Sequence, residues 1–490
     1  MGEDDIVALR RGKLESIRSN GIDPYPARAQ RTHTTKEAVE LLDRSPDGRD
    51  VISVAGRVTA MRRMGRASFL DLRDGHGRIQ AYFKQESVGV ESYERLLQTV
   101  DLGDFLGVKG AVFRTKTGEP TIEAETFNIL AKALRPPPEK WHGLQDIEVR
   151  YRQRYLDLMA NSEVRDTFVA RSRIIQQVRR FMDARGYLEV ETPVLQSTAG
   201  GAAARPFITY HNALDRQQFL RIALELHLKR LVIGGFDKVY EIGRIFRNEG
   251  VSTKYNPEFT MLESYAAYAD YTVLIELVQE MICEVAGEVL RTTVVRAGQN
   301  EIDLTPPWRT ITLRDAIQER SGVDFDAYAD VESLRRAAAE TAVPVEPSWG
   351  RGKIIDELLT MHVEPHLVQP TFLIDYPVEL SPLAKRKAES PHLVERFELF
   401  IAGREVANAY SELNDPIDQR ERLLEQSRLR AAGDDEAETA DEDFLIALEH
   451  GMPPAAGLGI GIDRLVMALT GSSSIRDVIL FPALREKADS

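Results

Sequence analysis

The sequence predicts an α+β protein with two domains, a small OB-fold β-barrel followed by a larger domain that mixes helices and strands. Three observations lead to this prediction. The 490 residues exceed the roughly 250–300 at which single hydrophobic cores stop growing. Five short segments with alternating polarity crowd into residues 51–130, which is typical of a small closed barrel. Three consecutive prolines, Pro136 to Pro138, then interrupt any regular element.

The first domain is assigned to residues 1–135, and a linker to 136–150. A capping pattern, Thr34-x-x-Glu37, predicts a helix over 35–43, and a second helix is expected over 3–19. The predicted strands cover residues 52–58, 67–72, 78–83, 108–113 and 121–124.

The second domain is assigned to residues 151–490. Apolar residues at spacings of three, four or seven predict a helix over 163–185, which Gly186 ends. A strand is expected from Tyr187 to Leu195. Further helical patterns cover residues 222–233, 271–290, 313–319, 332–340, 353–362 and 416–431.

Composition excludes several classes of protein. Hydrophobic content of 43% and charged content of 29% are globular values, and no apolar run approaches the roughly 18–20 residues of a membrane helix. The N-terminal residues lack the pattern of a secretory signal. The single cysteine, Cys283, excludes a disulfide framework and a cysteine-based zinc site, so a cytoplasmic location is expected.

The net charge of −14 argues at first against a nucleic-acid partner. The charge is unevenly divided, however, because residues 1–150 carry a net charge of +1 and residues 57–84 a net charge of +5. A local basic field of this kind is compatible with RNA binding by the barrel.

A first group of charged and aromatic residues lies between Val239 and Tyr265, where two strands are expected around a polar turn at 250–256. Arg247 and Glu249 share a face of the first strand, which is expected to reach Glu249. On the second strand one face is shared by Phe259, Glu263 and Tyr265. Charged residues of this kind are rarely buried in a hydrophobic core, so this surface is better suited to binding a charged ligand.

A second group follows from a hairpin with the two-residue turn Ala402-Gly403. In that register Phe400 pairs with Glu405, and Glu398 lies diagonal to Glu405 on the same face. Two such carboxylates repel each other unless a hard dication such as Mg²⁺ lies between them. Further along, one face of the returning strand carries Asn408, Tyr410 and Glu412.

A third group is the glycine-rich stretch Gly457 to Gly461, followed by Asp463 and Arg464. Alternating glycines strip one face of side chains, so that a flat ligand can approach the backbone. Asp463 is expected to be the N-cap of the following helix, with Arg464 pointing back over the glycines.

Together these segments resemble the three signature motifs of class II aminoacyl-tRNA synthetases, at about 170–195, 239–265 and 457–470. Within that class the chain is most similar to the lysyl-tRNA synthetase family over nearly its whole length. The resemblance rests on long strings, among them 152–158, 200–207, 265–271 and 408–415. It implies a catalytic domain built on an antiparallel sheet flanked by helices, and an anticodon-binding barrel.

The resemblance implies the reaction, the partners and the site. ATP and Mg²⁺ would activate L-lysine to lysyl-adenylate and pyrophosphate, and lysine would then pass to the 3′ end of tRNA(Lys). Arg247 and Arg464 would be catalytic. The implied ATP contacts are Arg247, Glu249, Asn256, Phe259, Glu405 and Arg464. The implied metal ligands are Glu398 and Glu405. The implied lysine contacts are Gly201, Glu225, Glu263, Tyr265, Asn408, Tyr410 and Glu412.

In the barrel the resemblance implies that Arg62, Phe69, Gln80 and Glu125 contact the anticodon. Motif 1 implies a homodimer, and nothing in the pattern points to a membrane. The chain departs from the family at Tyr255, where a histidine is usual, which leaves that loop's contact with phosphate or tRNA open.

Three other interpretations stay open. An aspartyl- or asparaginyl-type synthetase would need a basic residue where Glu263 and Glu412 stand. A catalytically inactive RNA-binding relative would not need Arg247, Glu398, Glu405 and Arg464. A relative that lysylates a protein would lack the barrel.

Overall fold

The computed structural model describes residues 2–45, 49–138, 144–431 and 440–486. It divides into two compact units, Met1–Gln145 and Asp146–Ser490. Residues 139–143 of the expected linker lie outside the described residues. None of the described helices is long and apolar enough to span a membrane.

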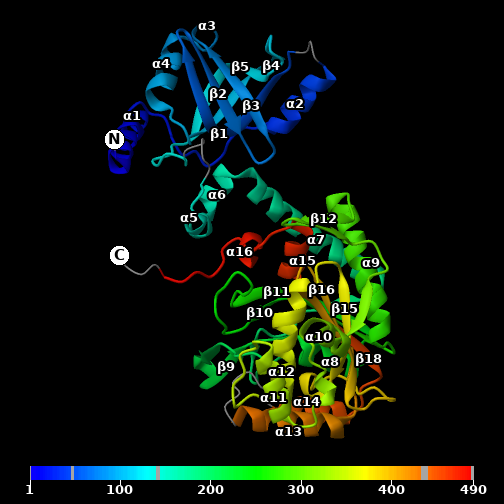
Figure 1. The fold of residues 1–490 in the computed structure, drawn as a ribbon. Coiled ribbons are helices and arrows are strands. Elements are labelled where there is room, and N and C mark those ends of the chain that lie inside the picture. Colours follow the sequence, from blue (N-terminus) through cyan, green and yellow to red (C-terminus); the bar gives the residue numbers. More distant parts are fainter. Residues whose placement is uncertain (1, 46–48, 139–143, 432–439, 487–490) are drawn as a thin grey trace. The chain divides into compact units, whose positions relative to one another are not determined.

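The first unit is a closed five-stranded barrel with the strand order β1-β2-β3-β5-β4 (Figure 1), which confirms the OB-fold prediction. Between the third and fourth strands lie two short helices that the sequence analysis did not predict, α3 (Gln85–Val88) and α4 (Val90–Thr99). The strands are β1 (Val51–Met64), β2 (Ala67–Arg73), β3 (Arg78–Lys84), β4 (Phe105–Arg114) and β5 (Pro120–Ala131).

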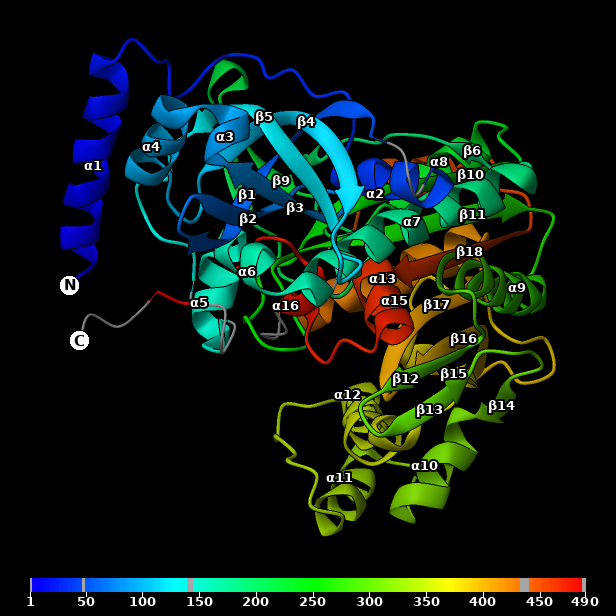
Figure 2. The ribbon, with the colours of Figure 1, turned by 90° about the horizontal axis from the view of Figure 1, so that it is seen from above.

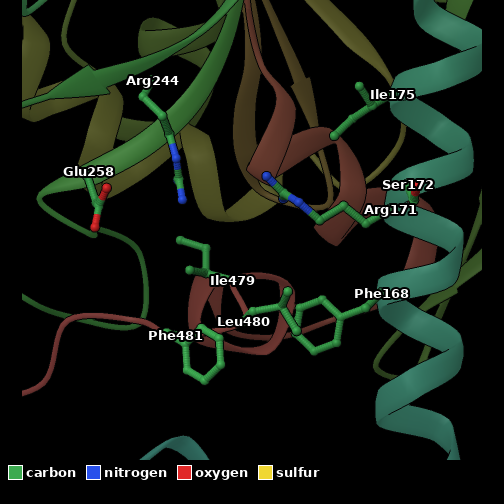
Figure 3. Close-up of a pocket in the computed structure, with 9 residues that line it drawn as sticks. All are labelled: Phe168, Arg171, Ser172, Ile175, Arg244, Glu258, Ile479, Leu480 and Phe481. Atoms are coloured by element: carbon green, nitrogen blue, oxygen red, sulfur yellow. The ribbon is translucent and has the colours of Figure 1, made fainter. Parts of the chain in front are cut away.

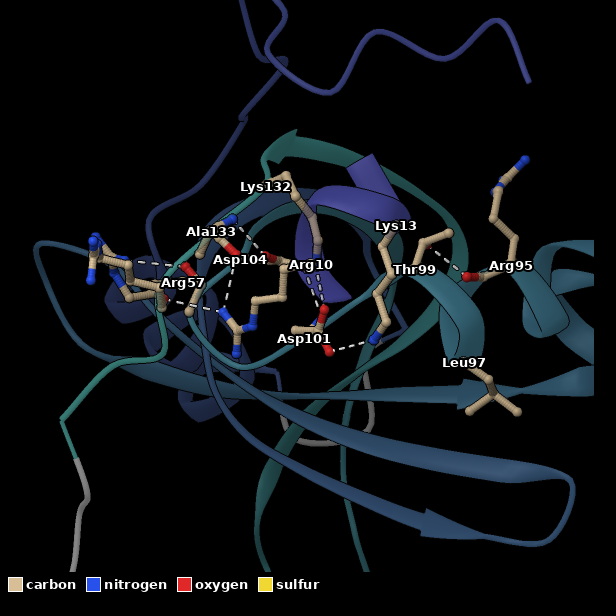
Figure 4. Close-up of polar contacts among 12 residues, drawn as sticks. Arg10, Lys13, Arg57, Arg95, Leu97, Thr99, Asp101, Asp104, Lys132 and Ala133 are labelled. Carbon is tan, nitrogen blue, oxygen red and sulfur yellow. Dashed lines mark hydrogen bonds and ion pairs between the residues drawn. The ribbon is translucent and has the colours of Figure 1, made fainter. Parts of the chain in front are cut away.

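Two further helices, α1 (Glu3–Ser19) and α2 (Thr35–Arg44), pack on this barrel through Ile17, Ala38 and Leu42. The predicted capping box at Thr34 and Glu37 is present. Polar contacts also hold α1, as Figure 4 shows. Arg10 donates to the carbonyl of Ala133 at 3.0 Å, and the Nζ of Lys13 lies 2.6 Å from Asp101.

The second unit is built on an eight-stranded sheet in the order β14-β15-β16-β17-β18-β11-β10-β6. Its strands are antiparallel except at the two edges, where β14 pairs parallel to β15 and β6 parallel to β10. The predicted antiparallel sheet is therefore confirmed. The bounds are β6 (Leu188–Glu189), β10 (Lys238–Phe246), β11 (Glu258–Ala267), β14 (Arg309–Thr312), β15 (Thr371–Pro377), β16 (Leu393–Ile401), β17 (Arg404–Ser411) and β18 (Ala455–Gly461).

Three helices, α7 (Ser162–Ala184), α9 (Tyr271–Leu290) and α15 (Ile462–Thr470), bury their apolar faces in the largest core cluster, together with Leu262 and Leu458 of the sheet. Burying these side chains contributes about 1.5–3 kcal/mol each. Elsewhere α8 (Glu225–Ile233) and α14 (Glu442–Glu449) share a smaller cluster with Tyr265. One face of the sheet is thus covered by the largest cluster, and the other carries polar residues such as Glu263 beside a smaller apolar cluster.

A third cluster lies at the β14–β15 end of the sheet. It joins Leu313, Leu334, Ile354 and Leu373, and Figure 2 shows the three helices that supply the first three residues gathered there. These are α10 (Leu313–Ser321), α11 (Val331–Glu340) and α12 (Arg351–Leu358). A π-helical turn, Leu359–Val363, follows α12, where the sequence predicted one continuous helix.

The remaining elements are short, apart from one helix. Instead of one strand from Tyr187 to Leu195, the chain forms only the two-residue strands β6 and β7, because the segment between them joins two different sheets. The other bounds are α5 (Ile147–Arg152), α6 (Arg154–Ala160), β7 (Leu195–Gln196), β8 (Ile208–His211), β9 (Arg216–Leu220), β12 (Val294–Ala297), β13 (Asn300–Asp303), α13 (Pro416–Ala431) and α16 (Ile475–Val478).

Candidate active site

Two rows of paired residues cross the centre of the sheet and form the floor of the candidate site. The first row runs across four strands through Glu263, Gly459, Asn408 and Glu398. The second runs beside it through Tyr265, Gly457, Tyr410 and Arg396. Because directly paired residues share a face, the sheet brings the predicted polar residues of three separate segments to one surface.

A β-bulge brings Glu405 to the same surface. The hairpin turn at Ala402-Gly403 has the predicted register, with Phe400 opposite Glu405. The register then shifts, so that Leu399 pairs with Ala407 and Val406 has no partner. Without this extra residue, Glu405 and Asn408 would point to opposite faces, since their positions differ by an odd number.

Three buried carboxylates lie close to one another at one end of this floor. Glu225, Glu263 and Glu412 are 6%, 4% and 1% exposed. Glu225 begins α8 and accepts hydrogen bonds from Tyr410 at 2.7 Å. Glu263 accepts from the backbone N–H of Leu224 at 3.0 Å and from Tyr265 at 3.3 Å. Burial and the neighbouring Glu225 raise the pKa of Glu263 to about 7.

Glycines make room for these side chains. A Cβ atom at Gly457 would stand 2.0 Å from Oε1 of Glu412 and 2.5 Å from the ring of Tyr265. The side chains of Glu412 and Tyr265 therefore occupy the space over Gly457, where the sequence pattern predicted the approach of a flat ligand. At Gly201, where φ is +87°, a Cβ would lie 3.2 Å from that of Glu225. Both positions thus require glycine.

Two arginines, Arg247 and Arg464, lie near each other beside these carboxylates. Beneath Arg247, Phe259 holds its ring 5.3 Å from the guanidinium, and Arg464 donates to Oε2 of Glu405 at 2.7 Å. The strand expected to reach Glu249 ends at Phe246. Arg247 and Glu249 lie beyond it, where Arg247 is held by a backbone hydrogen bond to Pro257. Strand alternation therefore does not decide which way their side chains point.

Two residues of this region are held by the rest of the chain. Asn256 donates to the carbonyl of Glu258 at 2.6 Å and accepts from the N–H of Ala483 at 3.0 Å. Asp463 is not the N-cap of α15, which is Gly461. Its carboxylate instead accepts from the N–H of Thr260 and from Arg171, at 2.7 and 2.6 Å, because these tertiary donors replace the local one.

The two predicted metal ligands share this surface. Burial raises the pKa of Glu398, although Arg396 opposes that change and Glu405 adds to it. Tyr376 donates to Glu398 at 2.8 Å. Among the described residues no group of three or more histidine, cysteine or acidic side chains could hold a metal ion. Two carboxylates suit Mg²⁺, which takes oxygen ligands and usually keeps several waters or phosphates.

On the barrel, Phe69 and Tyr82 stack with their ring centres 4.7 Å apart. The same outer surface carries Gln80, which pairs with Asp71, and Arg62, which pairs with Phe69 and lies 3.8 Å from Asp71. Glu125 is exposed at a bulge in β5. Strand pairing places Glu123, and not Glu125, directly beside Tyr82.

A pocket of about 540 Å³ lies on the other side of β10 and β11, and Figure 3 shows Phe168, Leu480 and Phe481 gathered on one side of it. It is also lined by Arg244 and Glu258. Side chains alternate along a strand, so Glu258 points away from the surface that carries Phe259. This pocket is therefore separate from the candidate site.

The sequence analysis missed two cations in the site. Lys229 contacts both Glu225 and Glu412 at 2.5 Å, and its position four residues after Glu225 on a predicted helix was an available signal. Arg396 donates to Glu398 and, at 3.0 Å, to Oδ1 of Asn408. It lies two residues before Glu398, so strand alternation already placed it on that face.

Comparison with known proteins agrees with this arrangement. Residues 146–485 match the family of tRNA synthetases class II (D, K and N), and residues 52–130 match the OB-fold nucleic acid binding domain. A lysine–tRNA ligase of Moorella thermoacetica is 58% identical over 487 residues, covering 99% of both chains. One from Pelotomaculum thermopropionicum is 55% identical over 99% of this chain and 96% of its own.

A third relative, the lysine–tRNA ligase of Bacillus subtilis, is 52% identical over 99% of this chain and 98% of its own length. The two matched domains agree with this full-length similarity, and so does the sheet that carries the three motifs. The chain belongs to the class II tRNA synthetases, in the family of the lysine–tRNA ligases.

Proposed function

We propose that this chain is a lysine–tRNA ligase, which activates L-lysine with ATP and transfers it to the 3′ end of tRNA(Lys). The observation that carries the proposal is the pocket with three buried carboxylates, Glu225, Glu263 and Glu412. Buried carboxylates are costly unless cations pair with them. All three amino acids carry an α-ammonium group. Only lysine adds a second ammonium on its side chain, whereas the side chains of aspartate and asparagine carry none.

In the first step an oxygen of the lysine carboxylate attacks the α-phosphorus of ATP, and the bond to the pyrophosphate oxygen breaks. Such a displacement needs alignment and charge neutralisation, with no nucleophile from the protein. Arg247 would hold the α-phosphate and the carboxylate, and Arg464 the γ-phosphate. The adenine would stack on Phe259, with Glu249 and Asn256 at its edge.

Glu398 and Glu405 would hold Mg²⁺ through their carboxylates. When bound, this ion would neutralise charge on the phosphate oxygens of ATP. Arg396, Tyr376 and Arg464, which already contact these carboxylates, would keep the two side chains oriented.

Within the pocket Gly201 and Glu225 would receive the α-amino group. The side chain of lysine would be enclosed by the remaining polar residues, and its ε-ammonium would meet the acidic members among them. These residues are Glu263, Tyr265, Asn408, Tyr410 and Glu412.

Amino-acid-dependent exchange of pyrophosphate into ATP tests this function. We expect exchange with lysine and none with aspartate or asparagine, because the latter two cannot supply an ε-ammonium to the buried acids. Absence of lysine-dependent exchange by the full chain would refute both the ligase assignment and the proposed pocket, and would favour an RNA-binding relative without catalysis.

For the second step we propose residues 1–135 as the anticodon-binding domain, a linker at 136–150, and residues 151–490 as the catalytic domain. The stacked Phe69 and Tyr82, with Arg62, Gln80 and Glu125 nearby, would receive anticodon bases by stacking and hydrogen bonds. We place the enzyme in the cytoplasm on the basis of its role in translation and its single cysteine.

Replacing Phe69 with Ala is expected to lower kcat/KM for charging of tRNA(Lys) by about 10–100-fold, since stacking on one base contributes about 1–3 kcal/mol. Lysine-dependent exchange should be unchanged, because it needs no tRNA. Aminoacylation and exchange measured on the same preparation check this result. A parallel loss of exchange would mean that Phe69 supports folding.

We further propose that the chain forms a homodimer through motif 1. There Leu188, Val194 and Leu195 expose 50%, 39% and 45% of their surface, which is unusual for neighbouring aliphatic residues unless a partner covers them. The double variant Leu188→Glu/Leu195→Glu is expected to sediment as a monomer where the parent sediments as a dimer. An unchanged dimer would remove this surface from the interface.

A further inference from the structure

Lys229 lies inside the proposed lysine pocket, although its own charge matches that of the substrate. Its side chain is fully buried. The Nζ atom lies 2.5 Å from Oε1 of Glu225 and 2.5 Å from Oε2 of Glu412. One contact joins neighbouring turns of α8, and the other joins α8 to the end of β17. A single ammonium group thus bridges two of the three pocket acids.

Removing a lysine ammonium from water costs several kcal/mol, which close pairing must offset. Burial lowers the pKa of Lys229, but Glu225 and Glu412 outweigh this effect and raise the pKa above its ordinary value. Lys229 is therefore a permanent cation of the pocket. Oε2 of Glu412 meets Lys229 as an ion pair, and neither of its carboxylate oxygens has a hydrogen-bond partner among the described residues, so this buried carboxylate can still accept hydrogen bonds from a ligand ammonium.

The charges of the pocket then match those of the substrate. When bound lysine holds all three carboxylates in their ionised form, they and Lys229 carry a net charge of −2, which the α- and ε-ammonium groups of the lysine neutralise. Without Lys229 the net charge would be −3, and one buried negative charge would have no counterpart. A buried carboxylate without a positive partner takes up a proton and loses its charge.

We propose that Lys229 is a positioning and specificity-determining residue, which bridges Glu225 and Glu412 so that the pocket accepts an amino acid with two positive charges. This inference rests on the proposed function, since it assumes that lysine binds between these acids. Lys229 does not touch the reacting atoms. It acts through the two carboxylates that would contact the substrate.

The charged and titratable groups around this bridge come from α8, α14, β11 and β17 and from residues next to these elements and to β10. Phe444 of α14 also faces Lys229, at 5.8 Å, and supplies no charge there. Nearby Arg230 is engaged by Asp441 and Asp443. The remaining groups are Glu225, Glu263, Tyr265, Tyr410, Glu412 and Arg247.

The test is the pH dependence of kcat/KM for lysine in pyrophosphate exchange by Lys229→Met. The acids bind ammonium groups only when they are ionised, and Lys229 favours the ionised form. Its loss should move the acidic limb of the profile upward by about 1–3 pH units. We expect kcat/KM for lysine to fall about 10–100-fold at pH 7 and to recover as pH rises. The KM for ATP should not change.

A matched control exists in the first unit. Lys132 is also fully buried, and its Nζ lies 2.6 and 2.7 Å from Asp101 and Asp104. Lys132→Met removes the same kind of bridge far from the pocket in sequence. It should leave the pH profile of lysine-dependent exchange in place, even if it destabilises the barrel.

Three results would overturn the proposal while leaving the ligase function standing. Tighter lysine binding by Lys229→Met would mean that Lys229 only competes with substrate. A uniform loss of kcat/KM for lysine at every pH, or an equal loss for ATP, would mean that Lys229 only supports folding.

If Lys229→Met does not fold, the variant Lys229→Arg provides the test. Arginine keeps the positive charge, so the acidic limb of the pH profile must stay in place while lysine binding weakens. A shifted limb in Lys229→Arg would also refute the proposal. Failure of the parent chain to exchange with lysine would instead refute the function.

Discussion

Replacing Arg247 with Ala is expected to lower kcat for lysine-dependent pyrophosphate exchange by about 100–1,000-fold, the range found when one preorganised donor to a developing charge is removed. Arg247 lies beyond the end of β10 over the ring of Phe259. Its charged neighbours are Glu249, Glu405, Arg464 and Glu263. It is thus surrounded by groups assigned to both substrates, at the place where their reacting atoms would meet.

Initial rates at saturating lysine and ATP check this prediction. Arg309→Ala is a suitable control, because Arg309 lies on the edge strand β14 of the same sheet and is exposed. Its loss should leave kcat unchanged. A fall of less than about tenfold for Arg247→Ala would contradict the role, since it corresponds to less than 1.4 kcal/mol in the activation free energy.

Strand periodicity was sufficient to predict which residues share a surface. Phe259, Glu263 and Tyr265 alternate along one strand, and the turn at Ala402-Gly403 fixes the pairing of Phe400 with Glu405. Both features depend on residues close together in the chain. The order in which the strands lie side by side depends on distant contacts, so no local pattern predicted it.

The predictions that were wrong or missing also concern residues whose positions depend on distant contacts. The cap of α15 was assigned to Asp463 from its neighbours alone, whereas Arg171 and Thr260 supply the donors that its carboxylate meets. The bulge at Val406 has no local signal, yet it decides that Glu405 and Asn408 share a face. Lys229 had a helical spacing to Glu225, but its contact with Glu412 crosses 183 residues of chain. Tertiary partners, rather than propensities, placed these residues.

Replacing Glu412 with Gln is expected to raise the KM for lysine by about 30- to 5,000-fold, because truncating one member of a buried charge pair costs about 2–5 kcal/mol. Glutamine preserves the shape of the side chain and removes its charge. The KM for ATP should stay within about twofold, since no residue proposed to bind ATP depends on this carboxylate. Exchange rates at varied lysine and varied ATP separate the two constants.

Gly457→Ala tests the same carboxylate without changing any charge. The new methyl group would stand 2.0 Å from Oε1 of Glu412, so the carboxylate must move away from the position that is left for the ε-ammonium. Both variants should therefore weaken lysine binding and spare ATP binding. If either weakened both substrates equally, the damage would lie in the sheet that the two sites share, and Glu412 would lose its place in the pocket. If Gly457→Ala alone were harmless, the ε-ammonium would bind Glu263 instead, the other acid proposed to receive it.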